Sequence, residues 1–263
     1  MLRNIKKNRE LIFLLTRLQI LQRYKGTYLG LLWTVINPLA MMVVYTFVFS
    51  VIIKVNWWGN VSGSFGEFAI ILFAGYIAFN VFSDSIMAAP GLIPENPNYV
   101  KKVIFPLETL PIILTLSSVI DSLFSIVILI ICNIIIMGKL SWTIILLPLM
   151  YVPLILLSLG VSWILATIGV FFKDTKHMVA ILTQVLFFLT PLFYPLSAVP
   201  ERFRIFYNLN PLASIVNNFR RIILWGKMPV WDEFIIVSFY SLIICIFGYF
   251  IFTKNKKMFS DVI

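Results

Sequence analysis

The chain has little charge and few of the side chains that carry metal or acid–base chemistry. Its 263 residues include 11 acidic residues, two cysteines and one histidine, and only 12% are charged. The acidic residues are too scattered for a metal site, and His177 lies in a basic turn, where a single histidine is usually inert. The sequence also has no G-x-x-x-x-G-K-[ST] loop to cradle a phosphate. We therefore expect no enzyme activity and no cofactor bound by this chain.

What the sequence has in excess is apolar runs. Hydrophobic residues make up 60% of the chain, and the mean hydropathy is +0.98. These values lie outside the range of globular proteins, so the solvent must be a lipid bilayer. The pattern predicts an all-α integral membrane protein with six membrane-spanning helices. We expect the spans at residues 31–53, 68–89, 107–137, 142–172, 178–196 and 234–252.

The basic residues indicate how the chain is oriented. Lysines and arginines gather before the first span, at 101–102, at 173–176 and at 254–257, which are alternate ends of the spans. The positive-inside rule then places both termini in the cytoplasm. The net charge of +10 is explained as a topology signal, and we expect no nucleic-acid partner.

The segment 199–230 does not follow this rule. It should be external, yet it contains five basic residues and is too apolar for a solvated loop. We expect a re-entrant helical pair here, dipping into the outer leaflet and returning, with its non-helical backbone shielded by protein. The alternative is an ordinary long loop before the last span.

The stretch before the first span predicts a helix lying in the membrane interface over residues 9–25. Leucines recur on one helical face and polar side chains lie opposite, although Ile12 interrupts the polar face. A plain membrane anchor is the alternative. The helix runs without a break into residues 23–40, which are punctuated by glycines and Asn37-Pro38, so we expect a cytoplasmic partner to sit against this seam. The residues singled out in the interface helix are Arg17, Arg23, Tyr24 and Lys25.

A second cytoplasmic contact is expected in the loop between the second and third spans. Three prolines bracket a short polar piece, and Asn96 is suited to cap a helix that begins at Pro97. Such a rigid helix would transmit motion to a partner, whereas a simple turn is the alternative. The segment consists of Glu95, Asn96, Pro97, Asn98, Tyr99, Val100, Lys101 and Lys102.

Within the spans, Asp84 and Asp121 are costly and mark a candidate site. Neighbouring serines and Asn80 could satisfy both carboxylates as structural hydrogen bonds, and a proton relay or substrate contact is the alternative. The outer span ends carry aromatic side chains that could stack on sugars, although contact with lipid or packing in the core is the favoured explanation for any individual ring. These aromatic residues are Phe187, Phe188, Phe193 and Tyr194.

Four stretches give the chain a family resemblance. They are RYKGTYLGLLWTVINPL (23–39), ENPNYVKKVIFPLE (95–108), TPLFYP (190–195) and NLNPLASIVNNFRR (208–221). In this order they resemble the membrane subunit of type-2 ABC exporters that move lipid-linked polysaccharides, the O-antigen and teichoic acid class. The resemblance covers nearly the whole chain.

That resemblance implies a permease of the bacterial cytoplasmic (inner) membrane that works as a homodimer with two copies of a separate ATPase. ATP and Mg would be bound by the ATPase, and the substrate would be a lipid-linked polysaccharide among membrane lipids. Residues 95–102 would be the coupling helix, and residues 199–230 would be the re-entrant gate helices on the outer side. Arg220 and Arg221 could meet substrate phosphates or anchor the re-entrant pair to lipid headgroups.

Three other classes compete with this interpretation. An ion-coupled secondary transporter would show internal repeats with paired broken helices, and none is evident. A membrane-embedded transferase would need an acidic or histidine-rich metal site. An ABC exporter of a small lipid or drug is the nearest rival, because it would differ chiefly in the external region and the N-terminal segment.

Overall fold

The computed structural model describes residues 7–23, 26–53, 65–100 and 105–262, and helix is the only regular secondary structure in these ranges. The α-helices are α2 (Arg9–Arg23), α3 (Trp33–Thr46), α4 (Phe65–Ala88), α5 (Pro97–Val100), α6 (Leu110–Met137), α7 (Leu147–Phe171), α8 (Thr175–Leu189), α9 (Arg204–Asn208), α10 (Pro211–Ile223), α11 (Trp231–Asn255) and α12 (Phe259–Val262).

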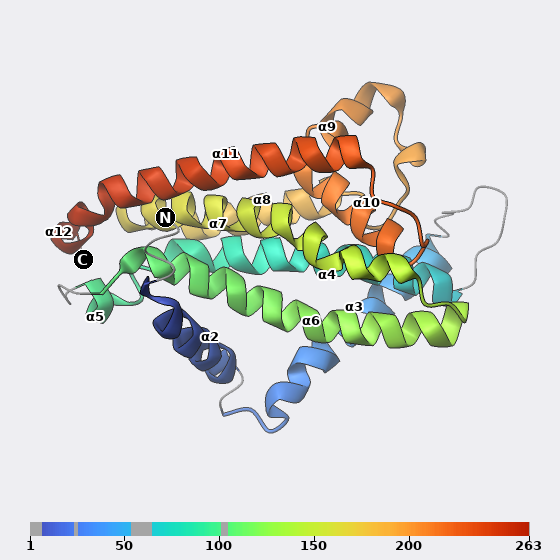
Figure 1. Ribbon diagram of the computed structural model, residues 1–263, viewed down its shortest axis with the longest axis horizontal. Coiled ribbons are helices and arrows are strands. Elements are labelled where there is room, and N and C mark those ends of the chain that lie inside the picture. Colours follow the sequence, from blue (N-terminus) through green and yellow to red (C-terminus); the bar gives the residue numbers. More distant parts are fainter. Residues whose placement is uncertain (1–6, 24–25, 54–64, 101–104, 263) are drawn as a thin grey trace.

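The long helices lie side by side in an elongated bundle, shown in Figure 1. The start of α2, the short α5 and the C-terminal α12 lie at one end of the bundle, and α9 and α10 lie at the other. Helix α2 runs obliquely outside the bundle before the chain turns into α3. Segments with the predicted cytoplasmic and external roles are thus separated by the length of the bundle.

Five helical segments in the described ranges are long and apolar enough to cross a membrane. They are Trp33–Ile52, Phe65–Gly91, Leu107–Met137, Trp142–Phe171 and Trp231–Val262. The fifth expected span corresponds to α8, which is apolar but has only 15 residues and ends at Leu189 rather than 196. Pro191 follows two residues later and restricts the backbone of the residue before it, so the helix cannot continue.

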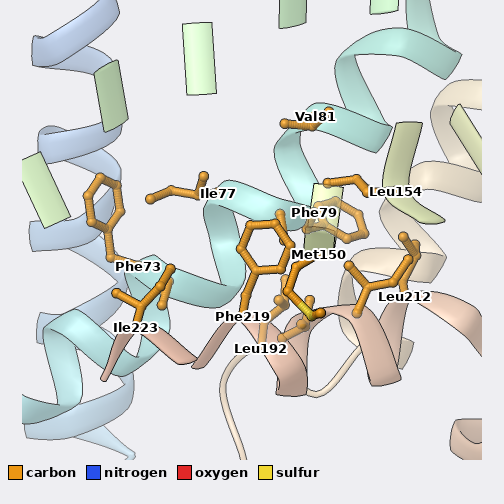
Figure 2. Packing of buried hydrophobic residues seen from close by; sticks show 14 of the residues in the cluster. Phe73, Ile77, Phe79, Val81, Met150, Leu154, Leu192, Leu212, Phe219 and Ile223 are labelled. Atoms are coloured by element: carbon orange, nitrogen blue, oxygen red, sulfur yellow. The ribbon is translucent and has the colours of Figure 1, made fainter. Parts of the chain in front are cut away.

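The centre of the bundle is α4, in which nearly every side chain from Phe68 to Ile86 is buried. Figure 2 shows how α10 packs against it: Phe219 lies among Ile77 and Phe79 of α4 and Met150 of α7, and Ile223 lies nearer to Phe73. Because α10 is strongly amphipathic, its apolar face enters this core while its polar face remains available for contacts at the end of the bundle.

Helices α7 and α11 approach each other through glycines. A Cβ atom added at Gly160 would lie 2.6 Å from the backbone of Cys245, and one added at Gly248 would overlap the carbonyl oxygen of Gly160. The two backbones are therefore in direct contact, which is how small residues let membrane helices pack closely.

Helix α3 is less regular and less covered than the others. Pro38 lies inside it, and the chain then passes into a π-helix at Phe47–Ile52. In the most apolar part of the segment Trp33–Ile52, only 6% of the residues are buried by the rest of the chain. The helix continues through Pro38, as the sequence predicted for Asn37-Pro38.

Candidate functional site

The seam between α2 and α3 turns at two glycines. Gly26 (φ 87°) and Gly30 (φ 51°) both have left-handed backbone, which other residues rarely adopt. No atom lies within 4 Å of a Cβ built at either position, so the glycines serve the turn rather than a close helix contact. Tyr24 and Lys25, which were predicted to belong to the interface helix, lie outside the described residues.

Just before this turn, Arg23 joins α2 to the two intramembrane carboxylates. Its Nη1 atom lies 2.5 Å from Asp121 Oδ2 and 3.9 Å from Asp84 Oδ2. The Asp121 side chain is 14% exposed, whereas Arg23 and Asp84 are about one-third exposed (32% and 35%). Asp121 is the twelfth residue of α6, which at 1.5 Å per residue is about 16 Å along that helix. The end of α2 therefore lies against α6 well along the length of the bundle, not at its end.

The hydroxyl groups expected to satisfy Asp84 and Asp121 form other hydrogen bonds. Ser117 and Ser118 donate to the Leu114 carbonyl, and Ser122 pairs with Tyr151 at 2.7 Å. The Asp121 Oδ1 atom is buried and has no hydrogen-bond partner in the described part of the chain. The partner that sequence reasoning missed is Arg23, which is 98 residues from Asp121 and carried no pairing signal.

A polar cavity of about 620 Å³ surrounds this ion cluster between α3, α4 and α6, and we call it the inner cavity. Its wall is formed by Arg23, Thr27, Trp33, Thr34, Asn37, Pro38, Met41, Tyr76, Ile77, Asn80, Val81, Asp84, Ser118, Asp121, Ser122 and Ser125. The seam, the second span and the third span therefore contribute to one site. Its volume is within the range of small-molecule binding pockets, roughly 300–1,000 Å³.

Helix α2 packs on the bundle through the face that the sequence marked as imperfect. Ile12 and Thr16 are buried, whereas Leu14 and Leu21 on the predicted apolar face are exposed to the surroundings of the bundle. Ile12 enters a hydrophobic cluster with residues of α6 and α7. The residue that interrupts the polar face is therefore the one that attaches α2 to the bundle. Arg17 is exposed along the same helix.

The predicted coupling segment contains a short helix, α5, that begins at Pro97 as expected. The Asn96 side chain donates a hydrogen bond to the Leu92 carbonyl at 2.9 Å, and Glu95 pairs with Lys176 at 2.9 Å with both side chains exposed. A groove of about 300 Å³ lies between this segment and α2, lined by Gln19 and Gln22 on one side. The structure thus brings α2 and the segment together. Lys101 and Lys102 lie outside the described residues.

At the opposite end of the bundle, Arg220 is fully enclosed. Its side chain donates hydrogen bonds to the carbonyl oxygens of Ile71 (2.9 Å), Pro191 (2.7 Å) and Leu192 (2.8 Å), and the residue is 2% exposed. Gly75 leaves space for the guanidinium, because a Cβ there would lie 2.6 Å from Arg220 Nη2. Arg220 therefore ties α10 to α4 and to the non-helical segment after α8.

A second cavity, of about 550 Å³, lies beside this segment and α11, and we call it the outer cavity. Tyr194 is in its wall, donates a hydrogen bond to the Phe188 carbonyl at 2.6 Å and pairs with the Tyr207 hydroxyl at 2.7 Å. Arg221 points away from the buried cluster and donates to the Met228 carbonyl at 2.8 Å. The two predicted arginines thus have different environments.

The predicted aromatic residues divide between core and surface. Phe193 is buried, stacks on Phe49 with ring centroids 4.1 Å apart, and contacts Phe187. Tyr45 joins these rings and also contacts Tyr76 of the inner cavity at 6.0 Å between centroids. Phe188, in contrast, is 54% exposed. An aromatic cluster therefore adjoins the inner cavity, and Tyr45 and Phe49 of α3 and the π-helix are members that sequence reasoning missed.

Comparison with known proteins identifies the family. The ABC-2 type transporter family matches residues 10–224, from the start of α2 to the end of α10. The chain belongs to the ABC-2 type transporter family. The O-antigen export system permease protein RfbA of Myxococcus xanthus is 25% identical over 100% of this chain and 99% of that protein. RfbA of Klebsiella pneumoniae is 26% identical over 97% and 95%, and the polysialic acid transport protein KpsM of Escherichia coli is 22% identical over 92% and 93%.

In this ABC-2 type transporter, the matched region contains every residue that lines the inner cavity, the Glu95–Lys176 pair and the Arg220 contacts. Helix α11 lies beyond it, although it packs closely on α7 and lines part of the outer cavity. No group of three or more potential metal ligands occurs among the described residues of this transporter.

Proposed function

We propose that this chain is the membrane-spanning subunit of an ATP-driven exporter that moves lipid-linked polysaccharide across the bacterial cytoplasmic membrane. The observation that carries the proposal is the family match, joined by relatives named O-antigen export permease and polysialic acid transport protein that align over nearly their full lengths. ATP and Mg are bound by a separate ATPase subunit, and two copies of this chain assemble with two ATPase subunits.

The proposed topology has six crossings with both termini in the cytoplasm. Helices α5 and α12 lie at the same end of the bundle, which suits an even number of crossings (Figure 1). Exposed basic residues also lie at this end, in the turn before α8, in its first turn and around the end of α11, as the positive-inside rule requires: Lys173, Lys176, Lys254 and Lys257.

The sixth crossing requires α8 to span with the help of the segment that follows it. Fifteen helical residues cover about 22 Å, short of the roughly 30 Å hydrocarbon core. Irregular backbone at membrane depth must have its polar groups satisfied by protein. Arg220 supplies this for the Pro191 and Leu192 carbonyls, and Asn210 donates to the Thr190 hydroxyl at 3.1 Å. These contacts support a re-entrant α9–α10 pair that closes the outer end.

The segment Glu95–Lys102 docks on the ATPase, together with the neighbouring polar side chains of α2. Glu95 and Lys176 are 62% and 60% exposed, so a partner can reach both while they hold the segment near α8. Force is transmitted only if closed and open ATPase dimers contact this surface differently. The groove between α2 and the segment supports a two-part docking surface of this kind.

The proposal is tested by expressing the chain with its ATPase in cells that make the glycan but cannot export it. We expect surface glycan to be restored by the wild-type chain and lost with Glu95→Lys, while the ATPase still copurifies and hydrolyses ATP. Uncoupled hydrolysis without export indicates a coupling role for this segment. Normal export by Glu95→Lys would contradict that role, and no export by the wild-type pair would contradict the function.

A charge-swapped variant separates docking from the internal ion pair. Glu95→Lys with Lys176→Glu restores the attraction between these two side chains but presents inverted charges to the ATPase. If docking is the role of Glu95, the double variant remains deficient in export. Recovery of export by the double variant would instead assign Glu95 to holding α5 in place.

A further inference from the structure

The inner cavity has a largely polar wall between α3 and the apolar helices α4 and α6, and its chemistry indicates what it can hold. Among its lining residues, only Arg23, Asp84 and Asp121 are charged in their ordinary states, which gives a formal charge of −1. Acyl chains would displace water from these charged groups without offering polar contacts in its place, and removing water from a charged group is costly. A lipid tail is therefore a poor occupant, although the cavity adjoins the lipid-facing seam.

Charged ligands are also disfavoured. An anion would meet two carboxylates around a guanidinium that they already occupy at 2.5 and 3.9 Å. A metal ion would need several oxygen ligands, but the wall has only two carboxylates with Arg23 against them, and no group of three candidate ligands exists in the described ranges. A neutral ligand avoids both conflicts.

The rest of the wall suits a ligand with many hydroxyl groups. Asn37 and Asn80 carry amides that donate and accept hydrogen bonds, and Ser125 adds a hydroxyl. Trp33 and Tyr76 add aromatic surface with a polar tip, which can pack against the C–H face of a sugar ring. Alternating polar groups and flat apolar faces match the two kinds of surface that a sugar presents.

We propose that the inner cavity binds uncharged sugar units of the exported glycan, an inference that rests on the proposed export function. The cavity accepts one or a few neutral, hydroxyl-rich units at a time, and the Arg23–Asp84–Asp121 cluster sets its preference against acidic sugars. The adjoining aromatic cluster of Tyr45, Phe49, Phe187 and Phe193 bounds the site through the Tyr45–Tyr76 contact.

Protection of a cavity residue from chemical labelling tests this site. The exporter is assembled with its ATPase, Cys132 and Cys245 are replaced by alanine, and Asn80→Cys is introduced. A small thiosulfonate reagent is applied to membranes from cells that make the glycan and from cells blocked in its synthesis. We expect glycan to slow labelling at position 80 about fivefold or more, because a site that is mostly occupied is only briefly open to the reagent. The labelling rate of a Lys139→Cys control should not change. Equal labelling with and without glycan overturns the proposal.

The charge preference is tested with soluble probes on the same variant. A neutral maltooligosaccharide should slow labelling at position 80, and an oligosialic acid at the same concentration should not. Equal protection by both probes, or stronger protection by the acidic one, would overturn the assignment to neutral sugars.

A cavity-filling pair of variants supplies an independent measurement. Ser125→Phe places a ring in the cavity, and Leu123→Phe adds a similar ring to the same helix at an exposed position. We expect loss of export only in Ser125→Phe, with normal ATPase copurification as evidence of folding. Full export by a folded Ser125→Phe variant contradicts the proposal.

Failure of this proposal can be told apart from failure of the proposed function. If cells with the wild-type chain and its ATPase display glycan while position 80 is labelled equally with and without glycan, only the cavity proposal is wrong. If these cells display no glycan, the proposed export function is wrong as well.

Discussion

The contact between Arg23 and Asp121 shows how one side chain can hold a helix in place against its neighbour. Asp121 lies within an apolar span, where an unpaired carboxylate is expensive, and its Oδ2 atom finds the guanidinium of Arg23 at 2.5 Å. Because Arg23 is the last residue of α2, this attraction fixes the C-terminal end of that helix against α6. The seam that follows then needs the left-handed glycines Gly26 and Gly30 to turn the chain into α3.

Removing Arg23 should therefore destabilise the folded chain. Arg23→Ala leaves Asp121 14% exposed and without its cation, and the expected loss is about 1–3 kcal/mol, between that of an exposed pair and that of a fully buried one. Unfolding in detergent measures the loss, and a double-mutant cycle with Asp121→Ala isolates the pair. Lys176→Ala is the matched control, because it breaks a pair with both side chains exposed and should cost no more than about 1 kcal/mol. Equal losses in the two single variants would contradict this ranking.

Arg220 shows what the sequence can and cannot predict about a single residue. The residue could be singled out from the sequence, because an arginine is unusual in so apolar a segment between two predicted spans. Its partners were not, since they are backbone carbonyls from α4 and from the Pro191–Leu192 segment, which no side-chain pattern encodes. The same limit applies to Arg23, whose carboxylate partners lie on two other helices.

At the scale of elements, apolar run length predicted the helices of the third and fourth spans closely. It failed where covalent and packing constraints intervene: the proline at 191 shortens α8, and α11 continues as helix past the expected end at 252. The amphipathic pattern of residues 9–25 predicted α2, and the structure shows that its exception, Ile12, is an anchor. The periodicity and composition of apolar residues thus predict where the helices lie in the sequence. In α2, the residue that departs from the periodic pattern is the one that contacts the neighbouring helices.

The pairing of α7 with α11 depends on glycines that the spans themselves do not require. Gly248→Ala adds a methyl group that overlaps the Gly160 carbonyl oxygen, so one backbone must shift, and we expect a loss of about 1–3 kcal/mol in unfolding experiments. Gly66→Ala is the control, because its nearest atoms belong to the Ile136 side chain, which is 40% exposed and can rotate. A Gly248→Ala variant as stable as Gly66→Ala would show that the helices are not held this closely.

At the scale of the whole molecule, the two cavities and the two ends of the bundle have different chemistry. The inner cavity contains an ion cluster at the seam, and the outer cavity lies beside α10 and α11 near a guanidinium held by carbonyls. Helix α5, in the segment proposed to couple to the ATPase, lies at the end of the bundle that also holds α12 (Figure 1). An exporter of the proposed kind needs this polarity, because energy enters at one face of the membrane and cargo leaves at the other.

The polarity gives a direct prediction about which residues can be reached from outside the cell. In a chain with Cys132 and Cys245 replaced by alanine, single cysteines are introduced at four exposed positions: Asp174, Ser260, Lys139 and Lys227. With six crossings and a re-entrant α9–α10 pair, a membrane-impermeant thiol reagent should label intact cells only at 139 and 227, because those loops join helices at the α10 end of the bundle. Positions 174 and 260 should react only after permeabilisation. If α8 did not cross, 174 and 260 would lie on opposite faces, and labelling of either one in intact cells would contradict the six-crossing topology.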